Sequence, residues 1–166
     1  MSEEIIVFGN EILRKEAEEI EVFDDDLLQT VERMFEIMYQ SKGIGLAAPQ
    51  IALSKRLLVY DTGDDKGVLI NPIIKNKSSK TSVYEEGCLS VPGISEEVIR
   101  PARVVVEGFT PDKKEIKIEA KGLLATVLQH EIDHLNGVLF FDHLEDHLKK
   151  ELRPQLKKIK RLSKKK

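Results

Sequence analysis

The chain has 166 residues, the length of one ordinary domain. Apolar residues make up 41% of the sequence and charged residues 33%, a composition that fits a folded globular protein and excludes disordered and collagen-like classes. No stretch approaches the roughly 18 apolar residues of a membrane span, so we expect no membrane association. The single cysteine cannot form an internal disulfide, and residues 1–6 lack the features of a signal peptide. We therefore expect a cytoplasmic protein.

Charge is distributed unevenly along the chain. Residues 147–166 contain ten Lys or Arg and one Glu, whereas residues 1–146 contain 16 Lys or Arg and 28 Asp or Glu. The formal charge is therefore +9 in the tail and −12 in the body. A basic segment on an acidic body is typical of contact with a polyanion such as RNA, but a solvated helix with a lysine-rich end has the same composition.

The first half of the chain begins with a predicted helix. Residues 24–42 start with three aspartates that can cap a helix, continue with apolar residues at helical spacing, and end before Gly43. Residues 43–50, with the sequence GIGLAAPQ, are small and include a proline, which predicts a tight ordered loop. Short β-rich runs follow at residues 57–60, 68–70, 81–84, 104–106 and 114–120, and they predict antiparallel strands.

The last third of the sequence predicts two helices. Residues 123–137 are apolar on nearly all sides and end at Gly137, which predicts a buried helix with this glycine near its C-cap. After a short apolar run, a charged helix is expected from about His143, interrupted or kinked at Pro154. Helices near both ends of a strand-rich middle indicate the α+β class, with antiparallel strands packed around a buried helix.

The predicted buried helix carries the pattern His-Glu-x-x-His. Positions i and i+4 share one helix face, so His130 and His134 can direct two imidazoles at one point with Glu131 beside them. Three titratable groups in an apolar helix cost free energy unless something satisfies them, which favours a divalent metal over two surface histidines. A second pair at this spacing, His143 and His147, lies among charged residues and indicates a solvated helix face.

A catalytic metal site typically has three protein ligands and one open position, so a third ligand is needed. The spacing of the metzincin proteases continues as far as Gly137, but Phe140 stands where their third histidine would be. A glutamate ligand would have to come from Glu145 or Glu151, but both lie on a polar, basic segment that is not expected to fold back over a buried site. The remaining candidate is Cys88, although a lone cysteine is ordinarily a small buried apolar residue.

Three segments of this sequence resemble the signature motifs of bacterial peptide deformylases. These segments are residues 43–50 (GIGLAAPQ), 86–90 (EGCLS) and 130–137 (HEIDHLNG), in the same order and at similar separations. With the overall length and the order of elements, the resemblance covers about residues 5–145. It implies that residues 1–146 form a single deformylase-like catalytic domain, with residues 147–166 as a basic helical tail of the same domain.

The resemblance implies a role for each motif residue. Cys88, His130 and His134 would bind one divalent metal ion, iron(II) in this family, with zinc, nickel or cobalt as possible occupants of the purified protein. Glu131 would act as general base on the metal-bound water, and Gln50 and the backbone N–H of Leu89 would stabilise the oxyanion. The implied substrate-binding residues are Gly43, Ile44, Gly45, Tyr84, Glu86, Thr126, Val127 and His130. Arg100 is expected to hold Asp133 or Glu86 behind the metal-binding helix.

The implied substrate is a nascent polypeptide that begins with N-formylmethionine, and the products are formate and a free amino group. In some deformylases a C-terminal helix docks on the ribosome, which implies here an rRNA contact but no contact with DNA. The residues implied in it are Lys149, Lys150, Arg153, Lys157, Lys158, Lys160 and Arg161. Two alternatives remain: a zincin-like metallopeptidase that cuts internal peptide bonds, and a non-catalytic module that binds the ribosome or RNA.

Overall fold

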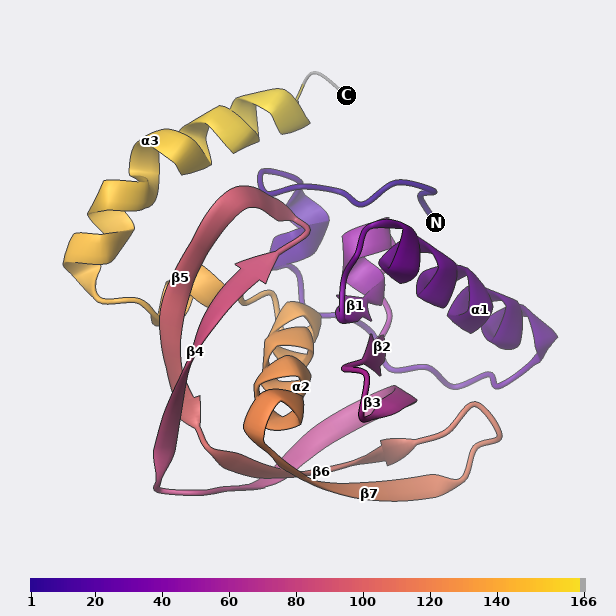
Figure 1. Cartoon of the computed structure of the whole chain (residues 1–166). Coiled ribbons are helices and arrows are strands. Elements are labelled where there is room, and N and C mark those ends of the chain that lie inside the picture. The colour runs from indigo at the N-terminus through magenta and orange to yellow at the C-terminus, as the bar shows by residue number, and fades with distance from the viewer. Residues whose placement is uncertain (165–166) are drawn as a thin grey trace.

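A computed structural model of the chain describes residues 1–164. Within these residues, three α-helices, three short 3-10 helices (η) and seven strands follow one another. Figure 1 shows how the helices and strands are arranged. In chain order they are η1 (Glu11–Arg14), α1 (Asp25–Gln40), β1 (Gly45–Ala47), η2 (Ala48–Ile51), β2 (Leu57–Asp61), β3 (Lys66–Lys77), β4 (Thr81–Cys88), β5 (Val91–Pro101), β6 (Arg103–Phe109), β7 (Glu115–Lys121), α2 (Gly122–Leu135), η3 (Phe140–His143) and α3 (Asp146–Ser163). No helix in this part of the chain has the length and apolar character needed to cross a membrane.

The strands form two antiparallel sheets, which confirms the predicted α+β class. Five strands follow the order β1-β2-β3-β6-β7, and β4 and β5 make a separate long hairpin. Figure 1 shows α2 in the centre of the molecule, with the β4–β5 hairpin on one side and the five-stranded sheet on the other. The helix that carries His130 and His134 is therefore enclosed by strands, as expected from its apolar sequence.

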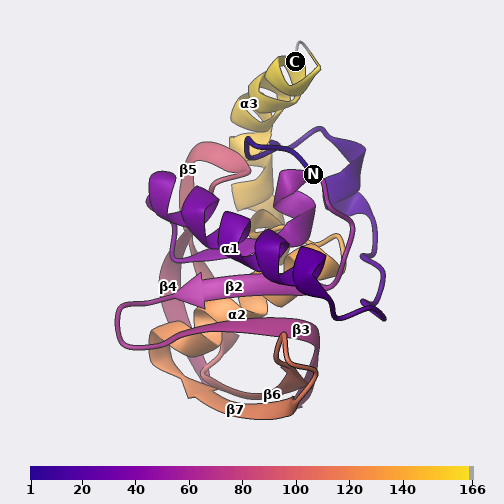
Figure 2. The ribbon, with the colours of Figure 1, turned by 90° about the vertical axis from the view of Figure 1, so that its right-hand side faces the viewer.

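Helix α1 packs against strands β1 and β2 of the five-stranded sheet. The Asp24 side chain accepts a hydrogen bond from the backbone N–H of Leu27 and so caps the first turn, as predicted. Buried side chains of α1, among them Met34 and Met38, pack in one apolar cluster with residues of β1, η2 and β2. Figure 2 shows α1 lying in front of β2. This packing fixes the position of the segment that enters the functional site from β1.

Helix α2 ends as the sequence predicts. Its C-cap is Asn136, and Gly137 follows with a φ of +74°, a left-handed conformation that glycine adopts without steric penalty. A side chain at this position would also collide with the backbone of Arg14, because an added Cβ would lie 2.6 Å from its carbonyl oxygen. Gly137 therefore serves both the helix end and the packing of η1 against it.

Two local predictions were wrong, and one strand was missed. Residues 43–50 were predicted as a tight ordered loop, but Gly45–Ala47 pair with β2 and Pro49 lies in the first turn of η2, where a missing N–H costs little. Strand β5 was not predicted, because Pro92, Gly93 and two adjacent glutamates obscure its alternation. The last helix begins at Asp146 and not near His143, which belongs to η3.

Helix α3 is part of the packed domain. Its buried residues Leu152, Leu156 and Ile159 join an apolar cluster with side chains of β5 and η3. The helix runs without a break through Pro154, so the predicted interruption is wrong, and it curves along its length (Figure 1). The expected basic tail includes Lys165 and Lys166, which lie outside the described residues.

Candidate active site

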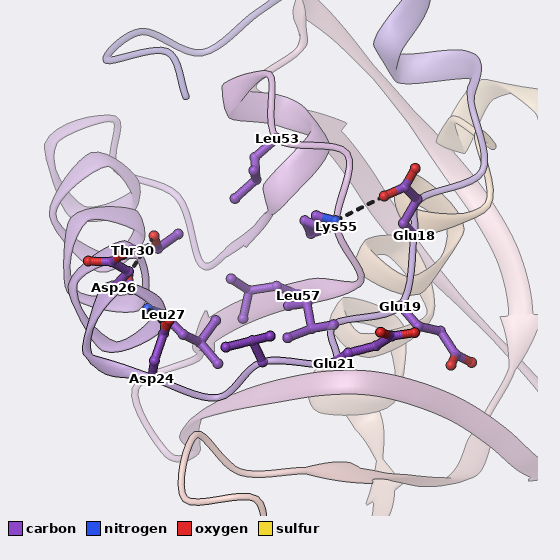
Figure 3. A pocket seen from close by; sticks show the side chains of 12 residues that line it. Glu18, Glu19, Glu21, Asp24, Asp26, Leu27, Thr30, Leu53, Lys55 and Leu57 are labelled. Carbon is purple, nitrogen blue, oxygen red and sulfur yellow. Dashed lines mark hydrogen bonds and ion pairs between the residues drawn. The ribbon is translucent and has the colours of Figure 1, made fainter.

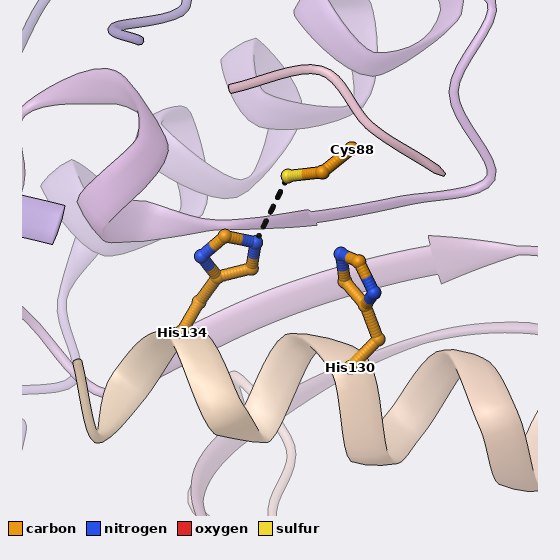
Figure 4. Close-up of side chains that lie close together, drawn as sticks. All are labelled: Cys88, His130 and His134. Atoms are coloured by element: carbon orange, nitrogen blue, oxygen red, sulfur yellow. Dashed lines mark hydrogen bonds between the residues drawn. The ribbon is translucent and has the colours of Figure 1, made fainter. Parts of the chain in front are cut away.

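A cysteine at the end of β4 meets two histidines of α2. Cys88 ends β4, where the register of the β4–β5 hairpin breaks between Gly87 and Cys88, and His130 and His134 lie one turn apart on α2. One potential ligand atom from each of the three lies within 4.8 Å of the others. The Cys88 sulfur lies 3.3 Å from Nε2 of His134, and Figure 4 shows both imidazoles directed from the helix toward the sulfur.

The electrostatics of this cluster favour a thiolate. Burial alone would raise the pKa of the Cys88 thiol, but the imidazoles of His134 and His130 outweigh burial and hold that pKa at about 5. One thiolate and two imidazoles are a donor set that suits a borderline divalent metal ion and leaves one position open. Nδ1 of His134 is buried and has no hydrogen-bond partner among residues 1–164, so this polar cluster is not satisfied by the protein alone. The residues present fit a metal centre.

A carboxylate and a guanidinium stand behind His130. Nδ1 of His130 contacts Oε1 of Glu86 at 2.9 Å, which leaves the Nε2 atom of His130 free to act as a ligand. Arg100 donates to Glu86 through Nε (2.8 Å) and Nη2 (3.0 Å), and through Nη1 to Asp133 Oδ2 (2.8 Å). Burial acts to raise the pKa of Glu86, yet the bonds from His130 and Arg100 lower it overall. The expected support by Arg100 is confirmed, and it involves both carboxylates.

Glu131 lies beside the cluster and takes no part in that network. The residue is 5% exposed, and its Oε1 atom has no hydrogen-bond partner in the described chain. Burial raises the pKa of this carboxyl group. Its Oε2 atom faces Gly45 so closely that a Cβ added to that glycine would lie 2.5 Å away. The structure thus holds an unpaired carboxylate next to the three potential ligands.

The amide of Gln50 also reaches the cluster. Its Oε1 accepts a hydrogen bond from the backbone N–H of Ala47, which fixes the orientation of the amide. Its Nε2 then points toward Cys88, 3.6 Å from the sulfur, and lies 3.2 Å from Oγ of Ser90. Ser90 was not singled out in the sequence, although it closes the EGCLS segment and is fully buried beside Gln50.

The cluster opens into a cleft of about 760 Å³, a size typical of sites for small ligands and peptides. All of the residues expected at the site line this cleft except His134, which lies beneath it. The cleft also takes in residues that the sequence reasoning did not select: Lys42, Glu85, Gly87, Val91, Pro92, Gly93, Ile94, Ser95 and Leu123. Most of them belong to β5, and finding them required recognition of that strand.

A second hollow, of about 670 Å³, lies between α1 and the segment that precedes it (Figure 3). Glutamate and aspartate side chains surround its apolar floor, and Lys55 pairs with Glu18 across one side at 2.9 Å. None of its lining residues belongs to the cluster of Cys88, His130 and His134. The second hollow therefore has no part in the cluster of potential metal ligands.

Comparison with known proteins settles the family. The model of the family described as polypeptide deformylase matches residues 2–150. The chain belongs to the polypeptide deformylase family. The peptide deformylase of Chromobacterium violaceum is 47% identical over 157 residues, which are 93% of each chain. A solved peptide deformylase of Legionella pneumophila is 41% identical with a TM-score of 0.88, covering 100% of this chain and 99% of that one. A Synechococcus elongatus peptide deformylase in complex with actinonin is 41% identical with a TM-score of 0.87, covering 93% and 86%.

Membership makes this chain an enzyme of a family of metal-dependent hydrolases, and it decides between the alternatives raised by the sequence. The metzincin reading required a histidine in place of Phe140, and in the structure the Phe140 ring stacks on His130 with centroids 6.1 Å apart. The deformylase family removes formyl groups from nascent peptides, so a zincin-like protease is disfavoured. A non-catalytic relative is disfavoured too, because Gln50, Cys88, His130, Glu131 and His134 are all present and meet at one cleft.

Proposed function

We propose that this deformylase hydrolyses the formamide bond of N-formylmethionyl peptides and releases formate and a free α-amino group. The observation that carries the proposal is the meeting of Cys88, His130 and His134 at an open cleft beside Glu131, a buried carboxylate whose Oε1 atom has no hydrogen-bond partner within residues 1–164. A general base adjacent to potential metal ligands, and separate from them, is the arrangement that hydrolysis of an amide requires.

Cys88, His130 and His134 would hold one divalent ion, which we propose to be iron(II). A bound ion supplies Lewis acidity, which lowers the pKa of water and polarises the formyl carbonyl group. The thiolate and two imidazoles suit zinc, nickel and cobalt as well, and those ions would occupy the same atoms in purified protein. Glu86 fixes the ring of His130 through its Nδ1 atom, so we assign Glu86 to orienting a ligand more than to contacting substrate.

Glu131 is the proposed general base. It accepts the proton of the attacking water and later delivers a proton to the nitrogen of the leaving amine. Burial raises the pKa of its carboxyl group, which brings it closer to the pH at which both transfers occur. Because its Oε1 atom has no partner in the described chain, the carboxylate can receive the proton without first breaking an internal hydrogen bond.

Two donors would stabilise the oxyanion formed when the formyl carbon becomes tetrahedral. The Nε2 atom of Gln50 already points toward Cys88, and the bond from Ala47 holds the amide in that orientation before substrate arrives. The backbone N–H of Leu89, next to Cys88 in the turn after β4, is the second proposed donor. A donor of this kind is worth on the order of 3 kcal/mol in the transition state.

The peptide would lie along the cleft between β1 and the turn after β4. Gly43, Ile44 and Gly45 offer backbone groups on the edge of the five-stranded sheet, where an extended chain can add as a strand. The methionine side chain would enter between Ile44, Tyr84, Thr126, Val127 and the ring of His130, all of which line the cleft.

Formate release from formyl-Met-Ala by the metal-loaded protein tests the proposal. Replacing Glu131 with Gln keeps its size and removes the base, so we expect metal content to remain and kcat to fall by about 1,000-fold or more. Digestion of casein, assayed beside it, should be absent. Unchanged formate release by Glu131→Gln would remove Glu131 from the mechanism, and no release by the wild-type protein would reject the proposed reaction.

We further propose that α3 contacts rRNA phosphates where nascent chains emerge. Exposed basic side chains cover the faces of α3 that do not pack on the domain: Lys150, Arg153, Lys157, Lys158, Lys160 and Arg161, with Lys149 partly exposed. Reversal of Lys150, Arg153 and Lys157 to Glu should weaken co-sedimentation with ribosomes and its dependence on salt. Reversal of the same number of charges at Lys114, Lys117 and Lys121, exposed near and on β7, is the matched control and should leave it unchanged. Equal binding by both variants would contradict the contact.

A further inference from the structure

The polar network behind His130 extends to the protein surface through a residue that the family motifs do not include. Nε2 of His143 lies 2.8 Å from Oδ2 of Asp133 and 3.5 Å from Nη1 of Arg100. Arg100 itself contacts the same Asp133 oxygen at 2.8 Å. Hydrogen bonds therefore run without interruption from His143 through Asp133, Arg100 and Glu86 to Nδ1 of His130.

The position of His143 is itself fixed by its surroundings. It ends η3, a single turn in which Oδ2 of Asp142 accepts a hydrogen bond from the N–H of Leu139. Arg14 holds the same carboxylate through Nη1 (2.6 Å) and Nη2 (3.2 Å), which ties η3 to the distant η1. The sequence reasoning placed His143 with His147 on one solvated helix face, but the structure puts them on different elements.

The turn η3 reaches His130 in two independent ways. Phe140, at the start of η3, stacks on the ring with an interplanar angle of 18°. His143, at its end, reaches the Nδ1 edge of the same ring through the hydrogen-bonded chain. A ring held on its face and at its edge keeps its second nitrogen directed at the cluster, which is how outer residues tune a metal ligand.

We propose that His143 is a positioning residue of this enzyme, which fixes Asp133 and Arg100 so that Glu86 holds His130 in its ligating orientation. Two donors, Nη1 of Arg100 and Nε2 of His143, converge on one oxygen of Asp133. Without His143 that carboxylate, 22% exposed, can turn toward solvent and release Nη1 of Arg100. The inference rests on the proposed metal centre, and it assigns His143 no contact with substrate or reacting atoms.

The experiment measures loss of cobalt(II) from loaded protein to a chelator, followed by the absorption of the thiolate–cobalt bond. His143→Ala removes the donor, and because the side chain is 38% exposed the domain should keep its melting temperature. His143→Gln restores an N–H donor. His147→Ala is the matched control, since that side chain is 65% exposed and pairs with Glu145, at 3.3 Å, outside the network behind His130.

We expect cobalt loss to be on the order of 10-fold faster in His143→Ala, at the lower end of the range for outer residues. His143→Gln should return it to within about twofold of wild type, and His147→Ala should not change it. In turnover of formyl-Met-Ala at saturating metal, His143→Ala should lower kcat with KM unchanged. Equal cobalt loss in His143→Ala and His147→Ala, or no rescue by Gln, would overturn the inference. Absence of formate release in the wild type would reject the proposed reaction, while the comparison of cobalt loss would still decide the role of His143.

Discussion

Replacement of Gly45 by Ala probes the position of the general base from a different strand. The φ angle of Gly45 is not left-handed, so alanine can adopt the backbone conformation of β1 without strain. Its Cβ, however, would lie 2.5 Å from Oε2 of Glu131 and 3.0 Å from the carboxyl carbon. To restore an ordinary contact of 3.4 Å, the carboxylate oxygen has to move by about 0.9 Å. The methyl group therefore displaces Glu131 and disturbs little else.

A displacement of about 1 Å in a catalytic group can reduce a rate 100-fold, which corresponds to about 2.7 kcal/mol in the barrier. We expect Gly45→Ala to lower kcat for formyl-Met-Ala by about this factor. The cost to the free energy of unfolding should be about 1 kcal/mol or less, because the colliding atom is the end of a side chain. Metal content should not change, because the three atoms nearest to the added Cβ all belong to Glu131 and none belongs to Cys88, His130 or His134.

Gly67→Ala supplies the matched control. A Cβ there would lie 2.6 Å from the hydroxyl oxygen of the buried Tyr60 and 2.9 Å from the ring carbon that bears it, a collision of similar severity with a rigid side chain away from the cleft. This variant should lose about 1–3 kcal/mol of stability and keep its kcat. The two variants thus predict opposite patterns in thermal unfolding and in turnover. A Gly45→Ala protein with wild-type kcat would show that the position of Glu131 does not limit the reaction.

Two further substitutions test the supports of the site and of α3. Arg100→Ala leaves the buried Glu86 without its cation. Metal affinity, measured by chelator competition, should therefore fall about 10- to 100-fold. Unchanged affinity would show that Arg100 does not help to hold His130. Leu156→Ala should lower the free energy of unfolding by about 2–3 kcal/mol in denaturant titrations, because Leu156 packs in the cluster shared with β5 and η3. A loss below about 0.5 kcal/mol would mean that α3 is not part of the packed domain.

The sequence predicts the long, regular elements of this protein well, because their patterns are local. Asp24 and the apolar spacing after it define α1, and Gly137 defines the end of α2. Strand β5 escaped prediction because Pro92, Gly93 and two adjacent glutamates hide its alternation, although it pairs with the neighbouring β4 in a hairpin. The three-residue strand β1 escaped prediction because its small residues are held in place by pairing with β2.

For the site, local spacing predicts that His130 and His134 share one face of α2. Elimination left Cys88 as a candidate third ligand, and the resemblance to a family gave it that role. No local pattern brings Cys88 to the helix, because the contact depends on the path of the β4–β5 hairpin. Ser90 was given no role although it lies in the EGCLS segment, and His143 was assigned to a solvated helix face. Their relevance comes from contacts with Gln50 and Asp133, which only the folded chain reveals.

We propose that one cation joins Cys88, His130 and His134. Protein purified without oxygen and crystallised under reducing conditions tests it through anomalous scattering at the iron absorption edge. We expect a single strong peak within about 2.0–2.4 Å of the Cys88 sulfur and of one nitrogen of each imidazole. An iron peak that lies away from the Cys88 sulfur, or at another place on the chain, would show that these three residues do not form the metal site.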